Sequence, residues 1–129
     1  MFSTWSDLSY NKAWAITGSV LKSMLGKDPM GWDPGPFALT EKDVVLDMLK
    51  KAGCRDAKGT VVTNIGETDS AKMAAYGFIH GLPLALLIQK ENPRMLATIL
   101  QTLENNLKAG LGEHPLKTPQ KALIFEATK

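Results

Sequence analysis

Residues 60–89, "TVVTNIGETDSAKMAAYGFIHGLPLALLIQ", decide the fold of this chain. The stretch begins with β-branched side chains, which favour an extended backbone, and we therefore predict a strand over residues 60–65. A short polar segment follows, and after it small side chains recur at helical spacing. Small side chains let a helix pack closely against a sheet, so residues 70–80 are predicted to form a helix.

The apolar run over residues 82–89 is the second strand that we predict. A continuous apolar run of this length is typical of a strand whose two faces are both covered, as in a parallel sheet. Its leucine and alanine content is also compatible with a buried helix, which is the alternative. Residues 73–89 carry no formal charge. Glycine and proline within them indicate two buried elements rather than one membrane helix, which needs about 17 to 25 residues.

Three further helices and one further strand are indicated by their end signals. The predicted helices cover residues 5–25, 40–52 and 93–109, and the predicted strand covers residues 121–127. A capping threonine begins the second of these helices, and Asn92 followed by Pro93 begins the third. A glycine follows each of the three helices, as is common at a helix C-terminus.

The order of these elements predicts an α/β fold in one domain, residues 1–129. From residue 60 onward, strands and helices alternate, which favours a parallel sheet with right-handed crossovers. We therefore expect a small three-layer domain in which helices flank three parallel strands. The predicted strands are residues 60–65, 82–89 and 121–127, and the predicted helices are residues 5–25, 40–52, 70–80 and 93–109. Along the chain, the expected parts of the domain are an N-terminal helix at 1–26, a Pro/Gly-rich loop at 27–39 and an α/β core at 40–129.

Composition places the chain among ordinary globular proteins. Hydrophobic residues make up 44% and charged residues 22%, both close to the average for folded domains. Fifteen Lys and Arg against thirteen Asp and Glu give a net charge of +2, and the two signs are interspersed. The sequence therefore predicts no nucleic-acid partner. The single cysteine, Cys54, and an N-terminus without a secretory pattern predict a cytoplasmic location and make a membrane an unexpected partner.

Candidate ligand-binding residues follow from the predicted parallel sheet, because ligands bind beyond the carboxyl ends of parallel strands. The residues expected at this edge are Gly66, Glu67, Thr68, Asp69, Ser70, Gln89 and Glu91. A phosphate site is disfavoured, since the polar segment has one glycine and two carboxylates and both glycine-rich phosphate motifs are absent. We predict no catalytic residue, no metal site and no cofactor, and we expect His80 to be a buried core residue.

One stretch resembles a known family. Residues 46–111 contain "LDMLKKAGCRDAKGTVVTNIG", then "PLALLIQ", then Pro93, Met95 and Leu96 at the start of a helix. This order is similar to the front half of class I S-adenosylmethionine-dependent methyltransferases. The resemblance implies a shared topology of alternating strands and helices. The family's cofactor loop has several glycines where this chain has only Gly66, and its ribose-binding acid would fall at Gln89, so the activity is not expected here.

The Pro/Gly-rich loop is the predicted contact surface for a partner. Its Met30, Trp32 and Phe37 belong to the residue types that dominate interface cores, although aromatic side chains also anchor loops to the body of a protein. We expect a non-catalytic domain that binds a protein, self-associates or serves as a regulatory or accessory subunit. The alternatives are a small-ligand or nucleotide-binding fold with a truncated methyltransferase-like topology, and a helical membrane-associated protein.

Overall fold

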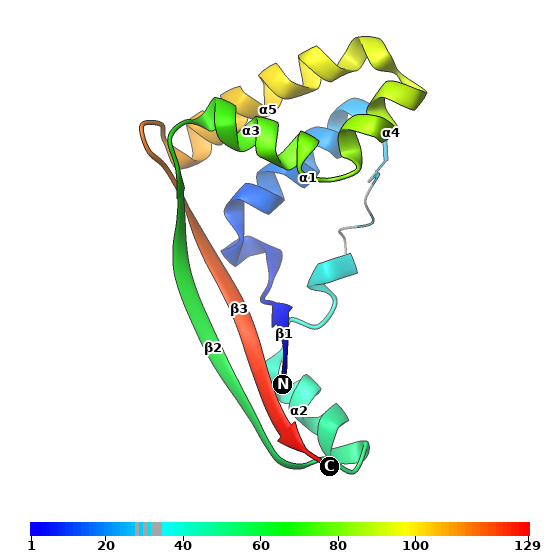
Figure 1. Cartoon of the computed structure of the whole chain (residues 1–129), viewed down its shortest axis with the longest axis vertical. Helices are drawn as coiled ribbons and strands as arrows, with labels where there is room; N and C mark the ends of the chain where they lie inside the picture. Colours follow the sequence, from blue (N-terminus) through cyan, green and yellow to red (C-terminus); the bar gives the residue numbers. More distant parts are fainter. Residues whose placement is uncertain (28, 30, 32–34) are drawn as a thin grey trace.

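The computed structural model describes residues 1–27, 29, 31 and 35–129. The described part is α/β, with five helices and one sheet of three strands. In chain order the elements are β1 (Phe2–Trp5), a 3-10 turn (Leu8–Tyr10), α1 (Lys12–Leu25), a 3-10 turn (Gly35–Phe37), α2 (Lys42–Lys51), β2 (Arg55–Thr68), α3 (Ala71–His80), α4 (Leu84–Glu91), a 3-10 turn (Pro93–Met95), α5 (Leu96–Leu111) and β3 (Leu116–Thr128). Helices α1, α3, α4 and α5 gather at one end, and the β2–β3 pair extends away from them toward α2 (Figure 1).

The sheet is antiparallel, with the strand order β1-β3-β2. Thr60 pairs with Ile124 and Thr68 with Leu116, so β2 and β3 run in opposite directions along almost their whole length. The predicted sheet of three parallel strands is therefore wrong. The predicted strands at 60–65 and 121–127 lie within β2 and β3, but they are direct neighbours, and α3, α4 and α5 occupy the connection between them.

Residues 82–89 are the main error of the sequence prediction, because they contribute to helix α4 and to the turn before it. Within α4, Leu84, Ala85 and Ile88 are buried whereas Leu86 is exposed. This burial follows the helical period and not the period of two that a strand requires. Leucine and alanine are strong helix formers, which is why the same apolar run folds as a helix here. Without a strand at this place, the alternating topology implied by the methyltransferase resemblance is absent as well.

The N-terminal segment also departs from the predicted helix 5–25. Phe2–Trp5 forms β1, which pairs with β3, and α1 begins only at Lys12. The predicted end of the helix is confirmed, since Gly26 adopts the left-handed conformation at φ 69°. Helices α2 and α3 lie inside the predicted ranges 40–52 and 70–80, and α5 begins three residues after the predicted start, behind the 3-10 turn at Pro93–Met95.

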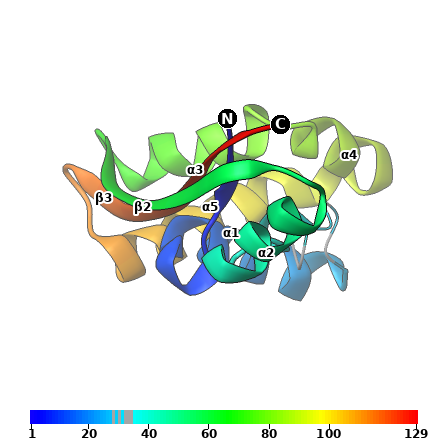
Figure 2. The same ribbon diagram turned by 90° about the horizontal axis from the view of Figure 1, so that it is seen from below.

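Two hydrophobic clusters hold the fold together. The larger one joins α1, α3, α4 and α5 with Leu116 at the start of β3. In the smaller one, Val45 of α2 packs against Leu123 and Phe125 of β3. Helix α2 lies so close to β2 that a Cβ atom at Gly59 would sit 2.8 Å from Cγ of Lys42. Successive strand residues point to opposite faces, so α2 and the helical cluster cover opposite faces of β3 near its two ends. Figure 2 shows α2 and α3 on either side of the paired strands.

Residues 73–89, which carry no formal charge, form parts of α3 and α4. Among the described residues, no single helix has both the length and the apolar composition to cross a bilayer. Helices α3 and α4 meet that criterion only when taken as a pair, and the chain bends by 75° at the break between them.

Candidate functional site

The polar segment after β2 is a helix cap. Ser70 has an extended backbone, and its Oγ accepts a hydrogen bond from the backbone N–H of Met73 at 3.2 Å. The backbone carbonyl of Asp69 lies 3.2 Å from Nδ1 of His114, which comes from the segment just before β3. Because the cap starts α3 directly after the strand, the first turns of α3 lie beside the adjoining ends of β2 and β3.

A cavity of about 420 Å³ opens between α1, α3 and the β2–β3 pair. Its lining is mostly apolar and comes from four parts of the chain. The lining residues are Ala13 and Trp14 of α1, Gly66, Glu67 and Thr68 of β2, Met73, Ala74, Gly77 and Phe78 of α3 with the following Gly81 and Leu82, and Leu116, Thr118 and Gln120 of β3. Its volume is within the range of roughly 300 to 1,000 Å³ that is typical of small-molecule sites.

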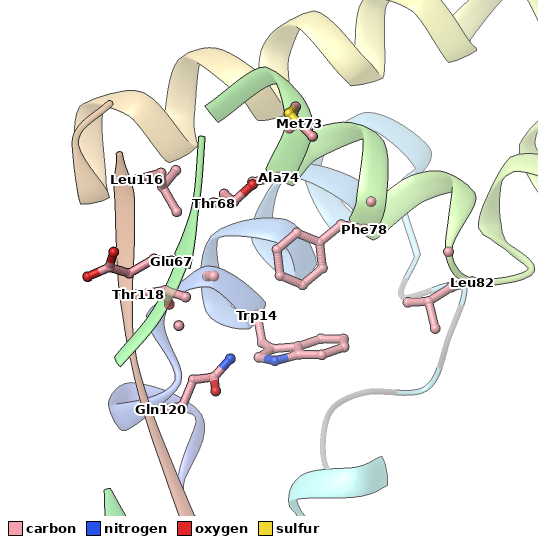
Figure 3. Close-up of a pocket in the computed structure, with 14 residues that line it drawn as sticks. Trp14, Glu67, Thr68, Met73, Ala74, Phe78, Leu82, Leu116, Thr118 and Gln120 are labelled. Carbon is pink, nitrogen blue, oxygen red and sulfur yellow. The ribbon is translucent and has the colours of Figure 1, made fainter. Parts of the chain in front are cut away.

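Aromatic rings form one wall of the cavity. The rings of Trp14 and Phe78 meet edge to face, with their centroids 4.9 Å apart. Trp5 and Phe37 also pack against Trp14, with ring centroids 6.3 and 6.5 Å away. This packing fixes the indole in place, since edge-to-face and tilted aromatic pairs are favourable arrangements. Figure 3 shows Trp14 and Phe78 facing the same open space, with Leu82 at its far end.

The strands supply the polar end of the cavity. In Figure 3, the amide of Gln120 points from β3 toward Trp14. Gln120 is half-buried, and its side-chain amide makes no hydrogen bond to another described residue. Thr118 adds a hydroxyl group on the same strand, and Thr68 adds another farther along, where it stands opposite Leu116. The Glu67 carboxylate at the rim pairs with Nζ of Lys117 at 3.0 Å. An amide and two hydroxyls both donate and accept hydrogen bonds, which suits a polar group on a ligand.

The predicted ligand-binding residues are divided by the structure. Gly66, Glu67 and Thr68 line the cavity, while Asp69 and Ser70 form the turn above it. Gln89 and Glu91 are exposed on α4 and do not line the cavity, and the Glu91 carboxylate pairs with Lys27 at 2.8 Å. They were expected at the same edge only because residues 82–89 were predicted as a strand. Ligand binding by the predicted set stays a prediction.

Several lining residues were not predicted from the sequence. Thr118 and Gln120 were missed because the last strand was expected to begin at residue 121, whereas β3 begins at Leu116. Pro115 and Pro119 interrupt the pattern of that segment and conceal the strand. Trp14 and Phe78 lie on helices whose sequences indicate apolar faces but not a cavity. The sequence did contain one indication of the cavity: Ala74 and Gly77 have small side chains, which leave space between α3 and the sheet.

The predicted contact loop is described only in part. Met30 and Trp32 lie outside the described residues. Phe37 is buried against Trp5 and Trp14, so it anchors its end of the loop to the body of the protein. Partner binding by Met30, Trp32 and Phe37 stays a prediction.

The remaining chemistry-bearing side chains are scattered. His80, which was predicted to be buried, is exposed, and its ring stacks on Tyr76 with the centroids 4.2 Å apart. Cys54 is a half-buried free thiol between α2 and β2. Over the part of the chain that the structure describes, no group of three or more His, Cys, Asp or Glu side chains is placed to hold a metal ion.

A charged cluster between α5 and β3 provides a prediction about pH. Nζ of Lys108 lies 2.5 Å from the Glu113 carboxylate, and His114 is adjacent. The hydrogen bond from Lys108 lowers the pKa of Glu113 and raises the pKa of Lys108. A depressed carboxyl pKa stabilises the folded state above the unfolded pKa, and this contribution disappears as pH falls through the folded pKa. In an NMR titration we expect Glu113 to titrate below the usual glutamate range, and Lys108→Ala to move its midpoint upward; an unmoved midpoint would contradict the pairing.

Comparison with known proteins adds no family assignment. Neither a scan against protein-family models nor a search of curated proteins finds a match for this chain.

Proposed function

We propose that this chain is a non-catalytic domain that binds a small ligand in the cavity between α1, α3 and the β2–β3 pair. The ligand has a flat or compact apolar body and one neutral hydrogen-bonding group. The observation that carries this proposal is the combination, in one cavity, of an aromatic and aliphatic wall with the side-chain amide of Gln120, which points toward Trp14. Largely apolar pockets with a few placed polar groups are the usual form of small-molecule sites.

The apolar body accounts for most of the expected affinity. Trp14, Phe78 and Leu82 present side-chain surface to the cavity, and burial of apolar surface contributes about 25 cal/mol per Å². Trp14 is held by Trp5 and Phe37, so little additional ordering of this side chain is needed on binding. A rigid aromatic wall reduces the entropic cost of association.

The polar end accounts for the expected selectivity. A ligand hydroxyl or amide can donate to and accept from Gln120, and Thr118 supplies a hydroxyl two residues away on the same strand. A hydrogen bond of this kind contributes about 1 kcal/mol. We therefore expect 2-naphthol, which has a hydroxyl group, to bind about fivefold more tightly than naphthalene, which has none.

The proposed biological setting is an accessory or regulatory domain in the cytoplasm. The free thiol of Cys54 supports a reducing compartment. The polar side chains of the cavity are of types that hold ligands by hydrogen bonds, which supports binding rather than turnover.

Gly77→Leu is expected to block the cavity while α3 is retained. No heavy atom lies within 4 Å of a Cβ atom built at Gly77, although this residue lines the cavity. A leucine there would occupy ligand space without a clash at its Cβ, and leucine favours the helix more than glycine does. We expect 2-naphthol to bind at least about tenfold more weakly to this variant, a loss of about 1.4 kcal/mol. The measurement is a titration followed by ¹H–¹⁵N spectra.

Two control variants separate blocking from other effects. Gly77→Ala adds a single methyl group and is expected to raise the free energy of unfolding by about 0.5–1 kcal/mol, with binding largely kept. Lys72→Leu places the same leucine on an exposed position of α3 outside the cavity, and binding should not change. If Gly77→Leu binds 2-naphthol as tightly as the parent chain, the cavity is not the binding site.

Protein binding is the second candidate function. The observation that favours it is the long and exposed outer edge of β2, which is occupied by no other strand of the described chain.

A further inference from the structure

The outer edge of β2 presents unpaired backbone groups. β2 is an edge strand of fourteen residues and pairs only with β3. The backbone carbonyl of Lys121 accepts from Ser6, and its N–H donates to Oδ1 of Asn11. The backbone groups of Lys121 therefore face β1, away from Thr63, its partner on β2. Because antiparallel pairs alternate between bonded and non-bonded, Val61, Thr63 and Ile65 direct their N–H and C=O groups to the open side.

Two contacts agree with this assignment. Pro119 stands opposite Ile65, a position at which the missing N–H of proline costs no bond to β2. The N–H of Ile65 is bonded instead to Oδ1 of the preceding Asn64 at 2.8 Å. The N–H at Ile65 is thus the one edge donor for which a side chain within β2 acts as acceptor.

Apolar side chains accompany the free edge. Val61 is 46% exposed and Ile65 is 58% exposed, and both point to the same face of the strand because they are an even number of residues apart. A long, exposed edge strand with apolar side chains pairs readily with another strand unless it is protected by charge, proline or a covering element.

We propose that β2 pairs with β2 of a second copy of this chain in an antiparallel register centred on Thr63. In this register each Val61 faces Ile65 of the second copy, and Thr63 faces its own equivalent. Glu67 of one copy then stands opposite Gly59 of the other. The inference deepens the second candidate function and does not rest on the proposed ligand.

Charge complementarity selects a second copy as the occupant. The side chain of Lys42 lies across Gly59 on the α2 face of the sheet, with Cγ and Cδ within 3.2 Å of a Cβ built there. Lys42 forms no ion pair with another described residue. Glu67 is on the same face as Gly59, since these two positions also differ by an even number. Its carboxylate pairs with Lys117 of its own copy at 3.0 Å, and a carboxylate has acceptor sites for a second ammonium group. The proposed register therefore brings each Glu67 to the Lys42 of the other copy, and twofold symmetry repeats the pair, as an isologous interface requires.

Sedimentation equilibrium measures the dimer, and charge-reversal variants test its register. The parent chain should show a dimer when its concentration is raised to about 1 mM. Glu67→Lys and Lys42→Glu, taken singly, should each weaken the dimer at least about tenfold, because each places two like-charged pairs at the interface. The double variant Lys42→Glu with Glu67→Lys should restore association. Failure of the double variant to recover it would overturn this register.

Two substitutions test the backbone pairing: one removes an outward N–H group of β2, and the other frees an N–H group that a side chain now occupies. Thr63→Pro removes an outward N–H while leaving the bonds to β3 intact, so the variant should keep its circular dichroism spectrum and lose the dimer. Asn64→Ala frees the N–H of Ile65 in both copies and should tighten the dimer about 30-fold, the value of two hydrogen bonds of about 1 kcal/mol each. If Thr63→Pro does not fold, the Asn64→Ala and charge-swap results decide alone.

The outcomes also separate self-pairing from protein binding in general. A parent chain that remains monomeric over this concentration range overturns the self-pairing. In that case, capture of another protein by the parent but not by Thr63→Pro would leave protein binding at the edge in place. A dimer that Thr63→Pro, the single charge reversals and Asn64→Ala all leave unchanged would overturn the proposed interface.

Discussion

Asn11→Ala is expected to lower the free energy of unfolding by about 3 kcal/mol. Asn11 is fully buried, and its side chain joins the segment between β1 and α1 to the central strand. Its Nδ2 lies 3.1 Å from the carbonyls of Ser6 and Lys121 and 3.2 Å from that of Asp7, while its Oδ1 accepts from the N–H of Lys121 at 3.1 Å. Alanine leaves the N–H of Lys121 without this acceptor, and an unsatisfied buried group costs about 1–3 kcal/mol.

Two comparisons make this expectation specific. Asn11→Asp preserves shape but replaces the donor with a carboxylate, so it should destabilise the fold at neutral pH and do so less in acid, where the carboxyl is protonated. Asn106→Ala is the matched control, because Asn106 also bonds a backbone carbonyl, that of Thr102 at 2.8 Å, but at an exposed position of α5. It should change stability by less than about 0.5 kcal/mol. Equal effects of Asn11→Ala and Asn106→Ala in urea unfolding would contradict the bridging role.

Leu84→Ala is the other large effect expected, at about 2–5 kcal/mol of lost stability. Leu84 is 0% exposed within the helical cluster, whereas Leu86, two residues later, is 72% exposed. Leu86→Ala should therefore change stability by less than about 0.5 kcal/mol. The difference arises because positions two apart lie on nearly opposite sides of a helix, while in a strand they share a face.

The pair of variants distinguishes α4 from the strand predicted at the same place. If residues 82–89 were a strand, Leu84 and Leu86 would share a face, and truncation of either side chain would lower the stability of the protein by a similar amount. Urea denaturation of both variants measures this directly, with the slope of each curve showing whether the transition stays cooperative. Similar losses for the two leucines would refute the helix.

How much of the fold the sequence specified depends on the segment. The glycine that ends α1 and the signals that bound α2 and α3 act within a few residues, so those boundaries could be predicted closely, whereas the start of α1 at Lys12 was missed. The β-branched residues of β2 likewise indicated a strand. Residues 82–89 could not be assigned from the pattern alone, because a fully apolar run has no period and the elements that cover it decide between helix and strand.

Strand direction was the part that local signals did not contain. Alternation of strands and helices usually indicates parallel strands, but removing one strand converts the same order into an antiparallel pair with a helical connection. The short β1 was hidden because Thr4 followed by Asp7 resembles a helix cap, whereas Asp7 caps the 3-10 turn Leu8–Tyr10. The partner residues of β1, 122–125, lie near the other end of the chain, and the neighbouring hydrogen bonds of Asn11 join it to Lys121, 110 residues away. No local pattern connects such distant residues.

Only part of the candidate site could be predicted from the sequence, for the same reason. Gly66, Glu67 and Thr68 were identified from their place after a strand, and they line the cavity. Thr118 and Gln120 come beside them only because β3 pairs with β2 in an antiparallel register. Gln89 and Glu91 were grouped with them through a strand that does not exist. Predicted contacts at Met30 and Trp32 remain predictions.

The most direct test of the account is a ¹H–¹⁵N titration of the isotope-labelled chain with 2-naphthol. Binding in the cavity should shift the signals of Gly66, Thr68 and Gly77 and the side-chain amide of Gln120, and should leave those of Gln89 and Glu91 unchanged. Saturable shifts confined to the first group are the expected result. Shifts centred on α4 or on α2, or no saturable shift at all, would contradict the ligand site on which the proposed function depends.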